Sequence, residues 1–551
     1  MTAPPVIPLG DIVDRQAAIN DGTALVMPRG VRLSYPELAQ RADSFALSLI
    51  GLGVRAGDHV GILMHNCADF VIALIAIAKT GAVSVPINGR FKPAEAGYVI
   101  GHADLNFLLV STDDAAPDYP HLAHRALNPQ LGDAHAPTGK TLRHVVDFSG
   151  RVESFLTRAQ FDAASTDVSP DALTSRQANV SVDDIALLMY TSGTTSLPKG
   201  CLLTHESISR HGPNVAQSFF ALTEDDAFWD PLPLFHCGGI VPMFACFSIG
   251  ATYCHAGHFE AGEALRTIRE EQCTVLYPAF EAIWLRILDH PDFTAADLAH
   301  VRVIQNIATP ERLTQFENRV PWAPQVTSYG ATEAASNLIL GHPDDPLEIR
   351  VNTLGRLVPG MEAKIIDPES GEEAPPGVFG ELCYRGYALF KGYYKAPEIN
   401  AAVFDDDGFF HSGDRAARRC DGTFIYGGRY KDMLKVGGEN VAAIEIEDLL
   451  VRHPAVRMAQ VVGVRDARYE EVPAAFIELN PGAESTEADI IEFCIDQLAT
   501  YKVPRYVRFV ADWPMSGTKV KKFELQNQLV AELDRDDIRK APRPTARVTT
   551  D

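Results

Sequence analysis

The sequence lacks a long hydrophobic run. Its longest uninterrupted apolar stretch, residues 70–78, is nine residues long, whereas a helix needs roughly 20 apolar residues to cross the hydrocarbon core of a bilayer. The N-terminus also lacks the basic segment and the apolar stretch that mark a secretion signal. We therefore expect no integral membrane segment and no export, and we expect the protein in the cytoplasm.

Closely spaced cysteines are absent as well. The nine cysteines are an odd number, they are scattered along the chain, and no two of them form a CxxC pair. This pattern argues against a disulfide framework and against a zinc site, and it fits a reducing compartment.

Positive charge is scarce relative to negative charge. Lys and Arg together number 49 and Asp and Glu number 72, so the formal net charge is −23 at pH 7. A field of this sign repels the phosphates of nucleic acids and of anionic bilayers, so we expect no nucleic-acid partner. A small anionic ligand stays compatible with this charge, because a few local donors can outweigh the mean field.

The chain is long enough for several folding units, since a domain averages about 150 residues. Apolar segments of strand length alternate with helical patterns, which predicts an α/β fold whose mostly parallel sheets are covered by helices. The predicted strands lie at 59–64, 82–87, 107–110, 185–190, 274–278 and 301–306, and predicted helices at 35–53 and 69–79. Residues 113–140 are expected to form a surface excursion.

The composition and the pattern of predicted strands and helices change twice toward the C-terminus. After about residue 356, short strands with Gly and Pro turns predict a β-rich subdomain. Beyond about residue 430, two strands and two helices predict a small α+β domain. We therefore expect an N-terminal domain over 1–430, a C-terminal domain over 431–533, and a disordered tail over 534–551, which is charged and poor in apolar residues.

Residues 190–200, YTSGTTSLPKG, are the most distinctive local feature. A predicted strand leads into a loop that is rich in hydroxyl groups and holds Gly193 and Lys199. Backbone N–H groups, hydroxyls and an ammonium in a small volume are what a polyphosphate needs. The loop is not a Walker loop, because Pro198 stands where a glycine is required. A polar surface turn is the alternative interpretation.

Further motifs follow in a fixed order. They are YGATE at 329–333, HSGD at 411–414, GRYKD at 428–432, GGEN at 437–440, and Lys519 within GTKVKK at 517–522. Each motif alone is weak, but together with the phosphate loop they span about residues 30–523. On these motifs the chain resembles the adenylate-forming (ANL) superfamily, in its acyl- and aryl-CoA synthetase branch.

The resemblance implies roles for the residues of the N-terminal motifs. Glu333 would hold Mg²⁺, a hard cation that prefers carboxylate and phosphate oxygens, and Thr332 would contact the α-phosphate. Tyr329 would lie against the adenine, and Asp414 and Arg429 would bind the ribose. The β- and γ-phosphates would be surrounded by Thr191, Ser192, Gly193, Thr194, Thr195 and Lys199. A solvated acid for Glu333 and a turn residue for Asp414 are the alternatives.

The same resemblance makes Lys519 the lysine that adenylation requires. Thr518 replaces the usual glycine before it, so Lys521 and Lys522 stay open as alternatives for this role. Solubilising surface lysines are the structural alternative.

The resemblance also implies a moving domain and a route for CoA. Lys431 would be the hinge about which the small, mobile C-terminal domain rotates between two poses. One pose presents Lys519 for adenylation, and the other builds a tunnel for the CoA thiol from Gly437, Gly438 and Glu439. His236 would be a gate between the acyl pocket and this tunnel, although a packing role is equally compatible with the sequence.

Together these features predict an AMP-forming acid–CoA ligase. The enzyme would use ATP to convert a carboxylic acid to an acyl-adenylate and then transfer the acyl group to CoA, with Mg²⁺ as cofactor. We expect a hydrophobic acid (fatty, aromatic or polycyclic), because residues 243–247 and 279–284 are mostly apolar. An enzyme loading a separate carrier protein, a luciferase-type oxygenase, and a nucleotide-binding protein without turnover are the alternatives. A homodimer stays open.

Overall fold

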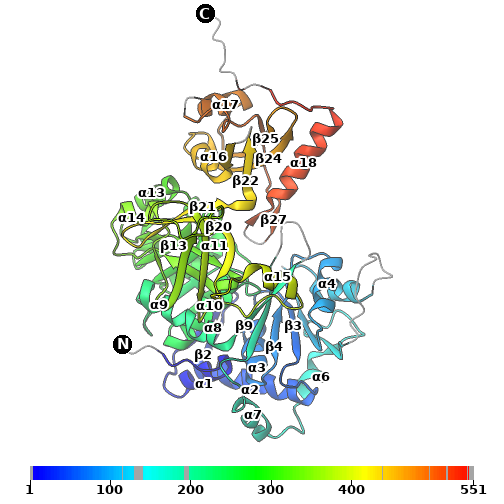
Figure 1. Ribbon diagram of the computed structural model, residues 1–551. Coiled ribbons are helices and arrows are strands. Elements are labelled where there is room, and N and C mark those ends of the chain that lie inside the picture. Colours follow the sequence, from blue (N-terminus) through cyan, green and yellow to red (C-terminus); the bar gives the residue numbers. More distant parts are fainter. Residues whose placement is uncertain are drawn as a thin grey trace, which may run out of the picture.

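The computed structural model describes residues 4–113, 116–128, 141–191, 198–436, 439–495, 497–516, 519–542 and 544. Two seven-stranded sheets form the body of a large N-terminal domain (Figure 1). The order of the first sheet is β14 (Gln325–Val326), β13 (Val303–Ile307), β12 (Val275–Phe280), β10 (Ala227–Asp230), β11 (Thr252–His255), β1 (Thr23–Met27) and β2 (Val31–Ser34). The order of the second is β7 (Leu156–Thr157), β6 (His144–Asp147), β5 (Phe107–Ser111), β3 (His59–Met64), β4 (Val83–Pro86), β8 (Ile185–Thr191) and β9 (Lys199–Thr204).

Both sheets are parallel except at one edge. Only the pairs β1–β2 and β8–β9 run antiparallel among the described strands of these sheets. The predicted mostly parallel α/β architecture is therefore confirmed.

Helices fill the space between the two sheets. One buried cluster contains Val60 and Ile62 of β3, Tyr253 of β11, and apolar residues of the intervening helices. These helices are α1 (Leu9–Ala17), α2 (Tyr35–Gly51), α3 (Ala68–Lys79), α8 (His205–Ser209), α9 (His211–Phe220) and α10 (Cys237–Ile249). Because α3 is apolar on nearly every face, it can be buried on all sides.

Further helices cover the outer faces of the sheets. Leu63, which points away from Ile62 because strand residues alternate, packs with α4 (Pro93–His102) and α5 (Tyr119–Leu127). The outer face of the first sheet is covered by α11 (Ala261–Glu270), α12 (Glu281–Leu288) and α13 (Pro310–Arg319). The domain is thus layered helix, sheet, helix, sheet, helix. The remaining helices of this domain are α6 (Arg158–Ala163), α7 (Pro170–Gln177), α14 (Leu347–Asn352) and α15 (Pro397–Val403).

Two antiparallel sheets complete the large domain. One contains β18 (Met361–Ile366), β19 (Gly380–Gly386), β20 (Phe410–Arg418) and β21 (Phe424–Arg429) in this order, and it lies in the segment after residue 356 for which short strands were predicted. The other contains β15 (Ser328–Ala331), β16 (Ser336–Leu340) and β17 (Arg356–Leu357). These sheets carry three of the sequence motifs.

A small C-terminal domain stands on top of the large one in Figure 1. Its sheet has the strands β22 (Met433–Val436), β23 (Glu439–Ala442), β24 (Val456–Asp466), β25 (Glu470–Leu479) and β26 (Tyr506–Phe509). The helices α16 (Ala443–Leu450) and α17 (Glu487–Ile495) cover one face, and α18 (Lys522–Arg535) covers the other through Leu525, Leu529 and Leu533. A short hairpin joins β27 (Met515–Ser516) to β28 (Lys519–Val520).

The segment expected to be a tail begins inside this domain. Helix α18 continues to Arg535, and the backbone N–H of Ala541 donates to Asp466 Oδ2 of β24 at 2.6 Å. Residues 545–551 lie outside the described residues.

Within the described part of the chain, no helix combines the length and the apolar character that a membrane span requires. The nine cysteines, all of them described, are free thiols.

Candidate active site

Asp414 lies at the centre of one half of the site. The register of β20 and β21 places it opposite Arg429, whose Nε donates to Asp414 Oδ1 at 2.9 Å. The Tyr329 hydroxyl donates to Asp414 Oδ2 at 2.6 Å. Burial, together with the negative charge of Asp414, raises the pKa of Tyr329 well above its ordinary value, so the phenol stays protonated and donates. Asp414 is only 3% exposed, and Asp414, Arg429 and Tyr329 come from three separate motifs.

The phosphate loop begins and ends at neighbouring positions. Thr191 and Lys199 are opposite each other in the β8–β9 pair, and the Thr191 hydroxyl donates to the Lys199 carbonyl at 3.5 Å. Ser192, Gly193, Thr194 and Thr195 lie outside the described residues.

Tyr393 joins Lys199 to Glu333, and no sequence motif had indicated it. Its hydroxyl donates to Glu333 Oε1 at 2.7 Å, and Lys199 Nζ lies 5.1 Å from the centre of its ring. Burial, and then the charge of Glu333, raise the pKa of Tyr393 well above its usual value. The tyrosine is therefore a fixed donor that orients one oxygen of the carboxylate.

Backbone pairing with β9 puts Tyr393 in this place. Residues 391–394 run beside β9 and hydrogen-bond to it at both ends of the segment. The bonds are Lys391 N to Leu202 O at 2.8 Å, Leu202 N to Gly392 O at 3.1 Å, and Tyr394 N to Gly200 O at 2.7 Å. The glycine-flanked tyrosines of KGYYK at 391–395 are the signal that could have drawn attention to it.

The surroundings of Glu333 suit a hard cation. Its Oε1 is bonded to Tyr393, whereas no described side chain or backbone N–H donates to Oε2. Two buried thiols are close by. Burial, and then the charge of Glu333, raise the pKa of Cys237 to about 12 and that of Cys201 well above its ordinary value, so both stay neutral. The oxygen left over on Glu333 fits the preference of Mg²⁺ for carboxylate ligands.

Thr332 and His236 are related through Cys237, which lies close to Glu333. The Thr332 hydroxyl is a hydrogen-bond partner of the thiol of Cys237, the first residue of α10. His236 directly precedes this helix, and its ring lies 4.8 Å from that of Phe235. The motif at 329–333 and the predicted gate are therefore adjacent in the fold.

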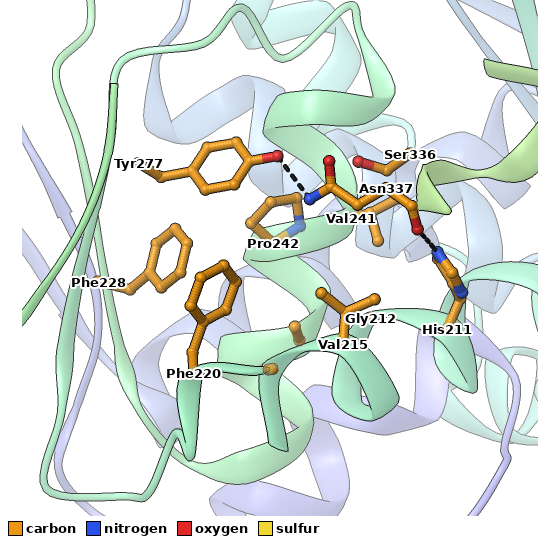
Figure 2. A pocket seen from close by; sticks show the side chains of 12 residues that line it. His211, Gly212, Val215, Phe220, Phe228, Val241, Pro242, Tyr277, Ser336 and Asn337 are labelled. Carbon is orange, nitrogen blue, oxygen red and sulfur yellow. Dashed lines mark hydrogen bonds between the residues drawn. The ribbon is translucent and has the colours of Figure 1, made fainter. Parts of the chain in front are cut away.

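A narrow cavity lies among α9, α10, β10, β12 and β16 (Figure 2). The space among these elements measures about 310 Å³ together with the open solvent at its mouth, and only a small part of it is wide enough for water. The lining is mostly apolar and consists of His211, Gly212, Val215, Ala216, Phe220, Phe228, Val241, Pro242, Ala245, Tyr277, Ser336 and Asn337.

The polar groups of this cavity bond to one another. Asn337 Nδ2 donates to the Tyr277 hydroxyl at 2.7 Å, and His211 Nε2 contacts the Asn337 carbonyl at 2.7 Å, as Figure 2 shows. Complete burial lowers the pKa of His211 to about 4, so its ring is neutral and donates from Nε2. The cavity therefore offers a ligand an uncharged, mainly apolar wall.

The cavity lies behind the turn that carries Glu333. Asn337 pairs with Gly330, and Ser336 with Ala331, in the antiparallel β15–β16 pair.

The lining of the cavity differs in two details from the apolar segments that the sequence analysis expected to line the acyl pocket. Ala245 is the only residue of the segment 243–247 in the described lining, and none of 279–284 is. Trp284 is instead fully buried against the outer helices.

The C-terminal motifs are described only in part. Lys519 begins β28 opposite Ser516, and Lys431 lies in the short helix η4 (Tyr430–Asp432), but their side chains lie outside the description. Gly437 and Gly438 lie outside the described residues, as does the side chain of Glu439 at the start of β23.

The two alternative lysines are engaged within the small domain. Lys521 Nζ bonds to Glu524 Oε1 at 2.8 Å, and Lys522 Nζ bonds to Glu447 Oε1 at 2.6 Å. Glu447 and Lys522 also line a polar cavity of about 340 Å³ that Tyr426 and Arg429 line from the large domain. The small domain therefore faces the neighbourhood of Asp414.

Two family models match the chain. The model of the AMP-binding enzymes matches residues 13–394, and the model of the C-terminal domain of AMP-binding enzymes matches residues 445–519. Together they cover both domains of the fold.

Individual relatives agree with these matches. A Bacillus subtilis protein assigned as an acyl-CoA synthetase, YngI, is 33% identical over 537 residues, which cover 95% of this chain and 97% of the relative. The human medium-chain acyl-CoA ligase ACSF2, described as mitochondrial, is 30% identical over 525 residues, which cover 93% and 85%. The structure of the anthranilate CoA ligase AuaEII in complex with anthranoyl-AMP superposes with a TM-score of 0.81 at 26% identity, covering 96% and 99%.

Proposed function

The chain belongs to the family of AMP-binding enzymes, it is an AMP-forming acid–CoA ligase, and we propose that the residues around Glu333 and Asp414 activate a medium-chain fatty acid. One observation carries the proposal. Tyr393 contacts both Lys199 and Glu333, Tyr329 donates to Asp414, and a mainly apolar cavity lies behind the turn that carries Glu333, which supports a nucleotide site in two halves beside an acyl pocket.

Adenylation brings three anionic groups together, namely the carboxylate of the acid, the α-phosphate of ATP and the departing pyrophosphate. The acid attacks the α-phosphorus of ATP, the bond to the β-phosphate breaks, and pyrophosphate leaves. Catalysis then depends on positioning and on neutralising charge. In our proposal, Asp414 and Arg429 hold the ribose, Tyr329 supports the adenine, and Thr332 contacts the α-phosphate. The loop residues Thr191, Ser192, Gly193, Thr194, Thr195 and Lys199 hold the β- and γ-phosphates.

Glu333 is the proposed ligand of Mg²⁺. When bound, Mg²⁺ neutralises phosphate oxygens and favours departure of pyrophosphate. Support comes from the geometry of the side chain, because Tyr393 orients Oε1 and leaves Oε2 without a described donor.

The small domain supplies the remaining charge in this proposal. Lys519 approaches the α-phosphate and the carboxylate of the acid, and the ion pairs of Lys521 and Lys522 favour Lys519 over these two neighbours. A rotation at Lys431 then withdraws Lys519 and brings Gly437, Gly438 and Glu439 to the CoA channel, with His236 as the gate.

The cavity supports a straight aliphatic acid. Its polar groups are paired with each other, and among the described residues no cationic side chain lines it to match a second carboxylate. Its small accessible space disfavours polycyclic acids, and the aromatic side chains of Phe220, Phe228 and Tyr277 line it. The medium-chain name of the human relative is consistent with this choice.

The test is an acid panel with full-length protein, ATP, Mg²⁺ and CoA. The panel runs from acetate to hexadecanoate and includes benzoate and a dicarboxylate, with AMP, ADP and acyl-CoA separated. We expect AMP and acyl-CoA in equal amounts, with octanoate at least tenfold better in kcat/KM than acetate, benzoate or hexadecanoate. Formation of AMP without acyl-CoA would favour loading of a carrier protein or oxygenation, and a preference for acetate or benzoate would overturn the substrate assignment.

A substitution in the cavity sharpens the test. Ala245→Leu fills part of the cavity and should lower kcat/KM for octanoate at least tenfold while activity on butyrate changes little. Ser248→Ala, one turn further along α10 and outside the lining, is the matched control. Thermal stabilisation by ATP checks that both variants fold.

Two further points belong to the proposal. The nine free thiols support a reducing compartment such as the cytoplasm as the place of action. A homodimer is compatible with the fold, and sedimentation of the purified protein decides it.

A further inference from the structure

Three side chains of metal-ligand type meet on one face of the β18–β21 sheet. Glu381 and Cys383 are two residues apart on β19, so they point to the same side. The register of β19 and β20 places His411 opposite Cys383. The sequence gave no sign of this cluster, because its members come from different strands and no close cysteine pair marks it.

The ligand atoms are close enough to share one ion. Cys383 Sγ lies 3.4 Å from His411 Nδ1, His411 Nδ1 lies 2.8 Å from Glu381 Oε2, and the three atoms all lie within 4.8 Å of one another. Ligands at 2.0–2.3 Å from a tetrahedral Zn²⁺ are about 3.3–3.7 Å apart. Small side-chain shifts therefore suffice to bring them to this spacing.

The neighbours of the cluster orient its ligand atoms. Glu381 Oε1 accepts from the backbone N–H of Gly413 at 2.9 Å, which leaves Oε2 to face the other two ligands. His411 Nε2 lies 3.8 Å from Asp405 Oδ2, and Lys364 Nζ holds this oxygen at 2.7 Å. A carboxylate behind the far nitrogen of a ligating histidine is the usual support of such ligands, since it fixes the ring and its tautomer.

We propose that Glu381, Cys383 and His411 bind a thiophilic divalent cation of the Zn²⁺ class. The cation takes the place of the hydrogen between His411 Nδ1 and Glu381 Oε2, the neutral ring then carries its proton on Nε2, on the side of Asp405, and Cys383 releases its thiol proton to solvent. A water molecule completes the tetrahedron and enters from the side of His411 and Glu381, which are half-buried, whereas Cys383 is fully buried. One thiolate, one imidazole and one carboxylate favour Zn²⁺ or Co²⁺ over Mg²⁺ or Ca²⁺.

The site adjoins the nucleotide site without sharing a ligand with it. Gly413, held by Glu381, adopts a φ of +71° that favours glycine, and it directly precedes Asp414. Because the two sites share no ligand, cation binding can be measured in the absence of ATP and acid. Its result then does not depend on the proposed reaction.

The experiment is a titration of chelator-treated full-length protein with Co²⁺, followed by displacement with Zn²⁺. We expect a thiolate-to-Co²⁺ charge-transfer band and intense tetrahedral d–d bands that saturate at one equivalent and vanish on addition of Zn²⁺. Absence of a thiolate band at saturating Co²⁺ would overturn the proposal.

Variants assign the band to these residues. Cys383→Ser should abolish the charge-transfer band, and His411→Ala should weaken Co²⁺ binding at least tenfold while circular dichroism stays unchanged. Cys420→Ser, which removes the exposed thiol between β20 and β21, is the matched control and should keep the band. Loss of the band in Cys420→Ser together with its persistence in Cys383→Ser would refute the site.

Discussion

Tyr393 connects the phosphate loop to the proposed magnesium ligand, because its ring lies beside Lys199 and its hydroxyl donates to Glu333. Replacing Tyr393 by Phe keeps the ring beside Lys199 and removes only the bond to Glu333 Oε1. Partners that orient a metal ligand typically contribute about 10–100-fold to metal affinity or activity. We therefore expect Tyr393→Phe to lower kcat/KM for ATP by about this factor and to shift the Mg²⁺ dependence of acid-dependent ATP–pyrophosphate exchange to higher concentration.

The adjacent residue offers a matched control. The Tyr394 hydroxyl donates to Asp104 Oδ2 at 2.8 Å, away from the nucleotide site. Tyr394→Phe should leave the exchange rate within about twofold at every Mg²⁺ concentration. Equal losses in the two variants would mean that Tyr393 acts through packing and not through Glu333.

The residues of the site differ in how far the sequence could predict them. Asp414, Arg429 and Tyr329 each stand in a recognisable motif, and the structure brings them together. Tyr393 stands in no such motif, because its position depends on pairing of residues 391–394 with β9, almost 200 residues earlier in the chain. Local patterns cannot encode a pairing between such distant segments.

Among the elements, strands and buried helices were predictable because their apolar period is local. The helix expected at 69–79 is α3 (Ala68–Lys79), and the strand expected at 59–64 is β3 (His59–Met64). Helix α5 (Tyr119–Leu127) was missed within the Pro- and Asp-rich segment 113–140. It is capped by Asp118 and depends on apolar contacts with β5 and α4, which composition does not reveal.

Helices α1 and α8 are joined by a contact that requires a neutral histidine. His205 Nδ1 accepts the backbone N–H of Leu9, the first residue of α1, at 3.1 Å. Burial lowers the pKa of His205 to about 4, whereas the pKa in the unfolded chain is about 6.5. Between pH 6.5 and 4 the unfolded state binds a proton on His205 and the folded state does not. The stability of the protein therefore falls as the pH decreases from 6.5 to 4, whereas the contribution of His205 is fully present above pH 6.5.

As the pH falls, we expect the protonation of His205 to lower the free energy of unfolding by up to about 3 kcal/mol. Urea unfolding between pH 7.5 and 4.5 measures it. His205→Asn, which keeps an acceptor without titrating, should flatten the dependence by up to one proton. An unaltered slope in His205→Asn would contradict the prediction.

At the level of the whole molecule, two arginine contacts hold the small domain against α13 of the large domain, one from Arg452 of the small domain and one from Arg312 of α13. Arg452 Nη2 contacts Glu311 Oε1 at 2.5 Å, and Arg312 Nη2 donates to the Arg457 carbonyl at 2.6 Å. The first pair is largely exposed, so screening by solvent makes it weak. Arg312 is 8% exposed, so its bond across the interface should contribute more to holding this pose.

Removing the Arg312 bond should loosen the small domain without unfolding either domain. In Arg312→Ala the Arg457 carbonyl loses its hydrogen-bond donor, and the side chain that reaches from α13 to the small domain is removed. We expect a larger radius of gyration by small-angle X-ray scattering and faster tryptic cleavage near the proposed hinge at Lys431, with the effect greater than in Arg452→Ala. Arg319→Ala is the control, because this arginine lies on the same helix and bonds only to Asp289 and Leu288 of the large domain among the described residues. If Arg312→Ala matched wild type in both measurements, the pose would have to be held by other contacts, such as apolar packing at the hinge.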